Sequence, residues 1–255
     1  MKYKFLLIFL VVFLLYPQNS KATSFSEIQR RYERFRTSEK ERLPIIKELF
    51  KAKGLSLENA EVYLRAIKHD STLELWDGNK GTHTFRLIRP YNICETSGML
   101  GPKRRKGDGQ VPEGLYVIDT FNPNSIFYSS LGINYPNASD RVLGKKGKLG
   151  GDIFIHGNCV TIGRIPIRDY HIKEGSIICG YARNSGQDNI EVHIFPTKFD
   201  SIGIKYLERH YPDSSLHKFW DDLNPIYRHF EVHKRLLKYT IDETGRYRTV
   251  EEKDK

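Results

Sequence analysis

The chain has 255 residues, a formal net charge of +10 at pH 7 and three cysteines. Three cysteines are too few for a disulfide-built scaffold, and at least one stays unpaired in a monomer, so we expect an ordinary hydrophobic core. The positive charge favours anionic partners. Because no zinc-ligand spacing and no aromatic stripe interleaved with arginines accompanies that charge, we do not expect nucleic-acid binding.

Residues 1–22 have the pattern of a secretory signal peptide. Lys2 and Lys4 precede an apolar run, Phe5 to Leu15, that is shorter than the roughly 20 apolar residues of a membrane-spanning helix. We expect cleavage after Ala22, with an uncleaved N-terminal anchor as the alternative. The segment carries three lysines and no acid, so its removal lowers the net charge to +7. The mature chain is then expected in the periplasm or cell envelope, without membrane contact.

The next segment, residues 23–69, has a helical pattern. Apolar residues from Phe25 to Phe50 recur at three- and four-residue spacing, which predicts helices. A further short helix is predicted from Ser56, carrying Val62, Leu64 and Ile67. We therefore expect a helical N-terminal extension that packs one face on the main domain.

From residue 70 the pattern changes to that of strands. Residues 72–76 and 82–88 predict a β-hairpin, and further strands are expected at 114–120, 126–131, 151–156 and 191–195. A helix is predicted at 169–182. The connection from Ser97 to Gly114 is long and rich in glycine, and loops of that length in a compact domain are commonly functional or disordered. Residues 70–198 are thus expected to form a β-rich domain.

The last segment, residues 199–255, returns to a helical pattern up to Leu237 and ends in a charged tail from Asp242, which we expect to be exposed. The whole chain is therefore predicted to be of the α+β class. Its β-rich centre is flanked by helical segments.

The stretch GGDIFIHGNCVTIGRI, residues 150–165, carries the clearest chemistry. His156 stands at the end of a predicted strand, where an imidazole can act as a general base near neutral pH. Gly163 allows a tight turn whose N–H, with that of residue 164, can point toward one spot and stabilise an oxyanion. The arrangement is typical of an acyl-transfer site that lacks a thiol or hydroxyl at the turn.

This stretch resembles the active-site signature of L,D-transpeptidase catalytic domains of the YkuD type, in which His-Gly is followed by Ser/Thr-x-Gly-Cys. His156-Gly157 and Thr161-Ile162-Gly163 match, and Arg164 stands at the position of the family's nucleophilic cysteine. Two further segments resemble the same branch of the family. They are SGMLGPKRRKGDGQVPEGLYVID at 97–119 and FYSSLGINYPNASDR at 127–141.

The resemblance implies a β-rich domain that acts on peptidoglycan stem peptides without a metal or organic cofactor. In the family, the cysteine attacks a peptide bond of a tetrapeptide stem, and the acyl group passes to an amine in cross-linking or to water in hydrolysis. The resemblance also implies roles for the matched residues. His156 would be the general base and acid, Gly163 the oxyanion turn, and Gly157, Thr161 and Arg164 substrate contacts.

Arg164 cannot itself be a nucleophile, because its guanidinium stays protonated in proteins. Three explanations remain open. The protein can be a catalytically inactive homologue in which Arg164 binds a stem-peptide carboxylate, or Cys159 can be a substitute nucleophile. Alternatively, a single base substitution has changed a cysteine codon, which resequencing would reveal. On a regular strand Cys159 would face away from His156, although a turn at Gly157-Asn158 would change that.

The remaining candidates have less support. Cys94 and Cys179 lie in apolar stretches and are expected in the core, and neither His171 nor His193 is part of a motif. The basic run Lys103, Arg104, Arg105 and Lys106 is expected to be a solvated loop or a contact for an anionic wall polymer. Such a contact should weaken with salt.

Overall fold

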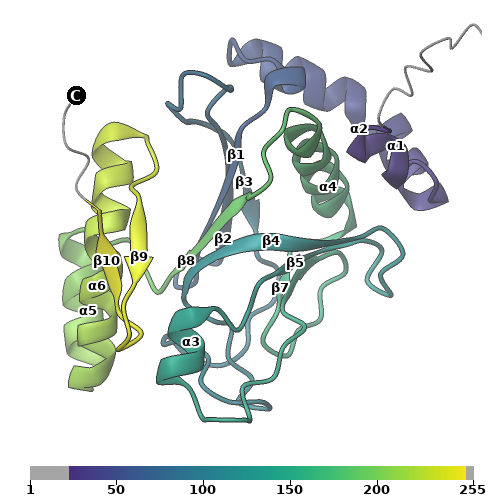
Figure 1. Ribbon diagram of the computed structural model, residues 1–255. Helices are drawn as coiled ribbons and strands as arrows, with labels where there is room; N and C mark the ends of the chain where they lie inside the picture. The colour runs from purple at the N-terminus through teal and green to yellow at the C-terminus, as the bar shows by residue number, and fades with distance from the viewer. Residues whose placement is uncertain (1–22, 251–255) are drawn as a thin grey trace, which may run out of the picture.

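The computed structural model describes residues 23–250 (Figure 1), so the signal-peptide prediction for residues 1–22 lies outside the described residues. The central feature is an eight-stranded sheet in the order β3-β2-β1-β8-β4-β5-β6-β7. The pairs β1–β8 and β6–β7 are parallel, and the other neighbours are antiparallel. The predicted α+β class is confirmed. The strands are β1 (Val62–Ile67), β2 (Thr72–Asp77), β3 (Arg86–Asn92), β4 (Gly114–Asn122), β5 (Ser130–Ile133), β6 (Phe154–His156), β7 (Ile165–Pro166) and β8 (Glu191–Phe195).

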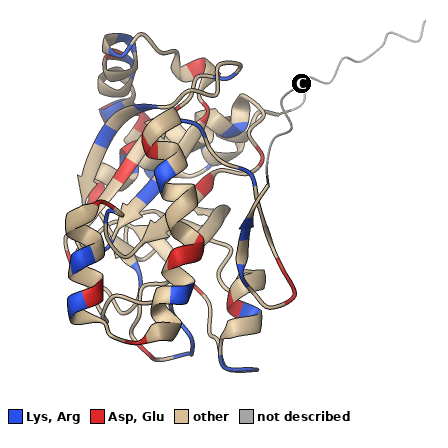
Figure 2. Ribbon diagram, turned by 90° about the vertical axis from the view of Figure 1, so that its left-hand side faces the viewer, with Lys and Arg blue, Asp and Glu red and all other residues tan. Residues whose placement is uncertain are grey.

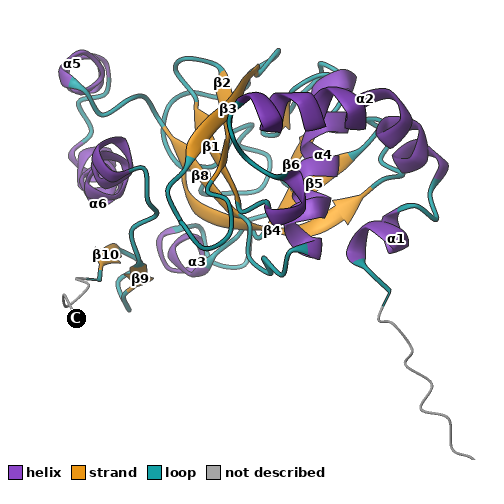
Figure 3. Cartoon of the chain, turned by 90° about the horizontal axis from the view of Figure 1, so that it is seen from above, coloured by secondary structure: helices purple, strands orange, loops and turns teal. Residues whose placement is uncertain are grey.

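Helices cover both faces of this sheet (Figure 3). On one side lie α1 (Phe25–Gln29), α2 (Glu33–Ala52), the short 3-10 turn η1 (Leu57–Asn59) and α4 (Asp169–Asn184). On the other lie α5 (Ser201–His210), α6 (Ser214–His233) and a hairpin of β9 (Tyr239–Ile241) and β10 (Tyr247–Thr249), while α3 (Ala138–Leu143) follows β5. Within residues 23–250, no helix has the length and apolar content needed to cross a membrane.

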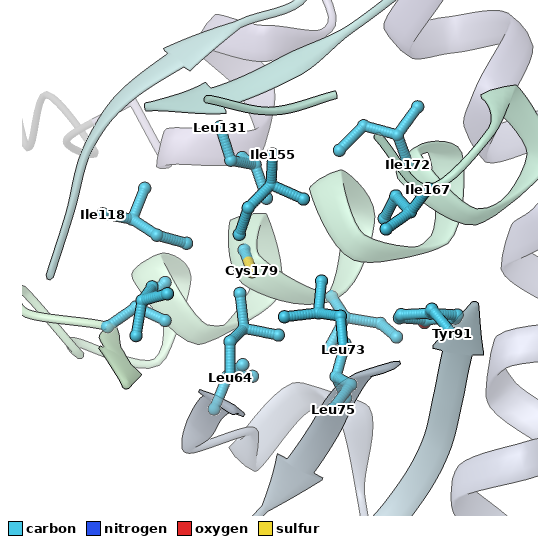
Figure 4. Packing of buried hydrophobic residues seen from close by; sticks show 14 of the residues in the cluster. Leu64, Leu73, Leu75, Tyr91, Ile118, Leu131, Ile155, Ile167, Ile172 and Cys179 are labelled. Atoms are coloured by element: carbon cyan, nitrogen blue, oxygen red, sulfur yellow. The ribbon is translucent and has the colours of Figure 1, made fainter. Parts of the chain in front are cut away.

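Two large hydrophobic clusters, and a small third one around Tyr63 and Phe230, fill the spaces between the sheet and its helices. Figure 4 shows the larger cluster, in which Cys179 of α4 lies among Leu64, Leu131 and Ile155 of the sheet. The other large cluster joins Phe195 of β8 to α6. Because the central strands are buried on both faces, the sheet is held between two apolar layers, and the strands β6 and β7 lie at one end of it.

The helix predicted over Val62, Leu64 and Ile67 is wrong, because these residues form β1. Every residue of β1 is buried, with Leu64 in the cluster beneath α4 and Ile67 in the cluster beneath α6. A strand buried on both faces has no alternation of polar and apolar residues, so its sequence does not distinguish it from a buried helix. Only the turn Leu57–Asn59 is helical there, and the expected extension over residues 23–69 ends in a strand of the sheet.

The expected exposure of the tail is also wrong in part. Tyr247 is buried, and its hydroxyl accepts hydrogen bonds from the N–H of Leu115 (3.2 Å) and from Nδ2 of Asn137 (2.9 Å). The tail therefore packs on β4 as the hairpin β9–β10. Because the residues around Tyr247 are mostly charged, the sequence did not show that this one tyrosine anchors the tail.

Other elements follow the prediction more closely. The hairpin is present as β2 and β3, the predicted helix is α4, and the strand expected at 191–195 is β8. The strands expected at 126–131 and 151–156 are shorter or shifted, at Ser130–Ile133 and Phe154–His156. These two strands form the part of the sheet that carries the candidate site.

Candidate functional site

The site loop, which we define as residues 157–164, joins two short parallel strands. Ile155 of β6 pairs with Ile165 of β7, and His156 pairs with Pro166. The loop thus brings the chain back so that Arg164 stands immediately before β7, which lies beside the strand that ends in His156. The sequence prediction of a histidine at a strand end, followed by a turn, agrees with this placement.

His156 is fully buried, and its ring has only one hydrogen-bond partner. Nδ1 lies 2.5 Å from the carbonyl oxygen of Gly157, which can only accept, so Nδ1 carries the proton and Nε2 is unprotonated. Nε2 has no hydrogen-bond partner among the described residues. Burial lowers the pKa of His156, and the nearby charge of Arg164 lowers it further against the opposing hydrogen bond to Gly157. A neutral imidazole with an unpaired nitrogen has the protonation state of a general base.

Two glycines give the site loop its shape. A Cβ on Gly157 would lie 2.5 Å from both Oδ1 of Asp169 and the carbonyl oxygen of Phe127. Gly163 has φ +83°, and a Cβ there would lie 2.8 Å from the carbonyl oxygen of Gln110. Both positions therefore exclude any side chain, and at Gly163 the backbone conformation also disfavours one.

The two N–H groups predicted to form an oxyanion turn both have partners. The N–H of Gly163 donates to Oγ of Ser97 (2.6 Å), and that of Arg164 donates to Oγ1 of Thr161 (2.8 Å). Thr161 in turn donates to the carbonyl of Arg164 (2.8 Å). Stabilisation of an oxyanion at this turn, which stays a prediction, would require Ser97 and Thr161 to release these groups. Sequence reasoning did not single out Ser97, although it begins a segment that carries the family resemblance.

The side chain of Arg164 lies over two aromatic rings. Its guanidinium carbon is 5.6 Å from the ring centroid of Phe154 and 5.8 Å from that of Phe127. Nε donates to the carbonyl oxygen of Asp152 (2.9 Å). The two terminal nitrogens have no hydrogen-bond partner among residues 23–250, so the planar fork of the guanidinium is held in place at one edge and open at the other.

The three cysteines differ from the expectations. Cys159 forms a disulfide with Cys94, with Cα atoms 5.7 Å apart, so it is not a free thiol and Cys94 is not simply a core residue. Cys179 is the free cysteine, and burial raises its pKa to about 12. A buried thiol with a raised pKa is not a nucleophile at neutral pH. The predicted burial of Cys179 is confirmed.

A cavity of about 180 Å³ opens beside the turn. Its wall includes Arg164 and Ser97 from the site, and His69 and Tyr206, whose rings are in contact at a tilt of 41° with centroids 4.2 Å apart. Polar groups from the turn thus face a partly aromatic pocket. This combination is typical of a site for a small polar ligand.

Comparison with known proteins decides the family. No protein-family model matches the chain. The chain is 36% identical over 177 residues to the proteins named "Putative L,D-transpeptidase YafK" in Escherichia coli K12 and O157:H7, which covers 69% of this chain and 68% of each relative. This chain belongs to the L,D-transpeptidase family.

Two solved structures are also similar to this L,D-transpeptidase-family protein, at low identity. The helical cell shape determining protein Pgp2 from Campylobacter jejuni, as its K307A mutant, aligns with a TM-score of 0.43 and 18% identity, over 72% of each chain. Bd1075 from Bdellovibrio bacteriovorus aligns with a TM-score of 0.38 and 18% identity, over 69% of this chain and 64% of its own.

A buried ion pair shapes the long loop that borders the cavity of this L,D-transpeptidase-family chain. Nζ of Lys68 lies 2.9 Å from Oε1 of Glu113 and donates to three backbone carbonyls of the loop, those of Met99, Gly101 and Val111. Glu113 also accepts from the N–H of Gly101 and from Trp220 of α6. The loop that delivers Ser97 to the turn is therefore anchored to β1 and α6.

The two other histidines considered in the sequence, His193 and His171, lie outside the site loop. His193 is buried on β8, between the hydroxyl of Tyr63 (3.0 Å) and Glu191 (3.2 Å). His171 lies in α4 against the ring of Tyr91. Over the described part of the chain, no group of three or more His, Cys, Asp or Glu side chains is arranged to hold a metal ion.

Proposed function

We propose that this member of the L,D-transpeptidase family binds peptidoglycan stem peptides without forming an acyl-enzyme. The observation that carries the proposal is the open edge of the Arg164 guanidinium. The backbone N–H and Nε of Arg164 have hydrogen-bond partners, whereas its two terminal nitrogens have none among the described residues. Two parallel N–H donors in a plane match the two oxygens of a carboxylate. A stem peptide ends in such a carboxylate, and the cavity beside Arg164 gives it room.

The state of the thiols supports binding over catalysis. The resemblance places Arg164 where the family has its cysteine, Cys159 is joined to Cys94, and Cys179 is buried. His156 is itself fully buried. In this state the described residues offer no thiolate beside the imidazole, so acyl transfer through a cysteine has no nucleophile.

An envelope location is part of the proposal. The net charge of +7 after residues 1–22 favours the anionic polymers and carboxylates found outside the cell. The disulfide supports the same location, because disulfides persist in oxidising compartments.

Calorimetric titration with a tetrapeptide stem tests the binding proposal. Arg164→Ala should weaken binding about 10- to 100-fold, since hydrogen bonds to charged groups contribute about 1.5–3 kcal/mol. Arg31→Ala is the matched control, because Arg31 is exposed and the substitution removes the same charge. A stem peptide with a C-terminal carboxamide should bind weakly to the wild type and be insensitive to Arg164→Ala. Equal affinity of wild type and Arg164→Ala for the free carboxylate would refute the clamp.

A second candidate function is thiol-dependent acyl transfer by Cys159 after reduction of the disulfide. The unpaired Nε2 of His156 favours it, because that nitrogen is free to accept the proton of an attacking thiol. A carbapenem probe with mass spectrometry separates the two functions. An adduct on Cys159 only after reduction would support acyl transfer. No adduct in either state, with one appearing in Arg164→Cys, would support loss of the nucleophile.

A further inference from the structure

The fold divides the basic run at residues 103–106 into an inner half, Lys103 and Arg104, and an exposed outer half, Arg105 and Lys106. Lys103 is buried, and its Nζ lies 2.5 Å from Oδ1 of Asp108. Arg104 pairs with the buried Asp140 (3.4 Å). Asp108 also accepts backbone N–H groups, including that of Arg105 (2.9 Å), and although burial raises its pKa, its hydrogen bonds together outweigh burial and lower the pKa. The expectation that all four basic residues form one solvated surface is therefore wrong for Lys103 and Arg104.

The outer half lies beside a second basic loop that the sequence analysis did not connect with it. The N–H of Lys106 donates to the carbonyl of Lys148 (2.7 Å), and the N–H of Lys145 donates to the carbonyl of Arg104 (2.8 Å). Two loops far apart in the sequence are thus joined through their backbones. The second loop follows α3 and runs along the lower edge of the molecule in Figure 1.

Together the two loops form what we name the two-loop surface. Its exposed basic residues are Arg105, Lys106, Lys145, Lys146 and Lys148 of the loops and Arg141 at the end of the adjoining helix α3. None of these side chains makes an ion pair within the described part of the chain, whereas the acids nearest in sequence, Asp108 and Asp140, are used internally. Figure 2 shows basic loop segments in blue at the lower edge of the molecule. The result is a concentration of positive charge without internal neutralisation.

We propose that the two-loop surface binds a linear polyanion of the cell envelope, at a position separate from the Arg164 turn. Closely spaced cations on a preformed backbone attract a chain of regularly spaced negative charges, since each contact is weak and many add up. The internal ion pairs of Lys103 and Arg104 hold the loop in shape before the ligand arrives, which reduces the ordering that binding requires.

A polymer fits this surface better than a lipid bilayer does. Stable binding to a bilayer combines cations with apolar side chains that enter the acyl region. Val142 and Leu143 of α3 pack partly against the turn at Gly245 but stay 46% and 41% exposed, and Leu149 is half-buried. The loops themselves, residues 103–109 and 144–148, carry no apolar side chain, so they present mainly charge to solvent.

The segment that follows the first loop of the two-loop surface runs past the turn at Gly163. Gln110, just after the first loop, approaches the backbone of Gly163 so closely that a Cβ there would lie 2.8 Å from its carbonyl oxygen. A polyanion on the surface would run near the cavity. The surface would thereby hold the protein on the wall while stem peptides are bound.

Binding to long-chain inorganic polyphosphate, measured by fluorescence anisotropy at low and at physiological ionic strength, tests the proposal. The triple variant Lys145→Gln/Lys146→Gln/Lys148→Gln should bind about 10- to 100-fold more weakly than wild type and depend less on salt. The control is Lys40→Gln/Lys51→Gln/Lys205→Gln, which removes the same charge from exposed positions elsewhere. Thermal melting of both variants checks that they are folded.

The outcomes are distinct. Selective loss in the first variant, with stem-peptide affinity unchanged, supports the two-loop surface and leaves the proposed function to its own test. Equal losses in both variants would show that only net charge matters and would overturn the proposal. Binding to phosphatidylglycerol vesicles without binding to polyphosphate would overturn it as well, in favour of a membrane surface.

Discussion

Phe127 covers His156, with ring centroids 4.5 Å apart and planes inclined by 32°. The guanidinium of Arg164 lies over the ring of the same phenylalanine. The histidine that matches the family's base is therefore closed off by an aromatic ring held in part by the arginine at the nucleophile position. Because His156 is fully buried, a ligand can reach its Nε2 only if neighbouring side chains such as Phe127 move.

Removing that ring should expose the histidine. We expect Phe127→Ala to make His156 react with diethylpyrocarbonate, whereas in the wild type exposed histidines such as His83 react and His156 does not. The stability cost should be about 1–3 kcal/mol, below that of a fully buried phenylalanine, because Phe127 is half-buried. Peptide mapping by mass spectrometry gives the site of modification. Phe154→Ala is the matched control, since Phe154 contacts Arg164 as well, and equal exposure of His156 in both variants would contradict a specific role for Phe127.

The disulfide should stabilise the fold and hide two thiols. Closure of a loop with a sequence separation of 65 corresponds to about 4 kcal/mol of unfolding free energy in the chain-entropy account. We expect Cys94→Ser/Cys159→Ser to unfold at correspondingly lower denaturant concentration. Thiol titration should find no reactive thiol in the native protein, one after unfolding, and three after unfolding and reduction. A reactive thiol in the native, oxidised protein would show that the disulfide is not formed.

Gly163 should tolerate alanine far less than another glycine of the same conformation. Gly163→Ala adds the cost of a left-handed backbone, about 1 kcal/mol, to a steric conflict with the carbonyl of Gln110. Gly107 has φ +77°, but an added Cβ there meets nothing within 4 Å. We therefore expect Gly107→Ala to cost only the backbone part, measured by urea unfolding. Equal losses would mean that the approach of Gln110 is not tight.

His156 should make stability depend on pH. Its pKa in the folded protein is lowered by burial, below the value of about 6.5 in the unfolded chain. The unfolded state then binds the proton more readily, so the contribution of His156 is fully present above about pH 6.5. It is lost as the pH falls from there through the lowered pKa. Burial lowers the pKa of His171 in the same direction.

Urea unfolding at neutral and mildly acidic pH checks this dependence. His156→Gln should show a smaller loss of stability on acidification than wild type, and His210→Gln, which changes an exposed histidine, should show the same loss as wild type. If His156→Gln and wild type lose stability in parallel, the buried imidazole does not carry the effect. Arg164→Gln should raise the pKa of His156 in a proton NMR titration.

The parts of the site that sequence could predict are those fixed by local chemistry. His156 at a strand end and Gly163 in a tight turn follow from residue types next to one another in the chain. Ser97 lies 66 positions from Gly163, and only the folded loop brings its hydroxyl to the turn. The pairing of Cys94 with Cys159 is likewise set by how the end of β3 meets the site loop, which spacing does not encode.

The fold was predictable to a similar extent. Strand β8 and helix α4 have clear periodic patterns and lie where expected, whereas β1 is buried on both faces and loses the alternation that marks a strand. The prediction that residues 103–106 form one solvated basic loop was wrong for a different reason. Lys103 and Arg104 turn inward because Asp108 and the buried Asp140 offer them carboxylates, and a charge count along the chain does not show which cations find a partner.

The oxygens around the ammonium group of Lys68 are arranged like the ligands of a small cation site, with the lysine side chain as the cation. Four oxygens, three from backbone carbonyls and one from Glu113, lie 2.9 to 3.0 Å from its ammonium nitrogen. Loops in other proteins fold around calcium with a similar set of oxygen ligands. Here the cation is the side chain of Lys68, the residue that follows β1, so these four oxygens already surround a positive charge, and a chelator should leave the shape of the loop unchanged.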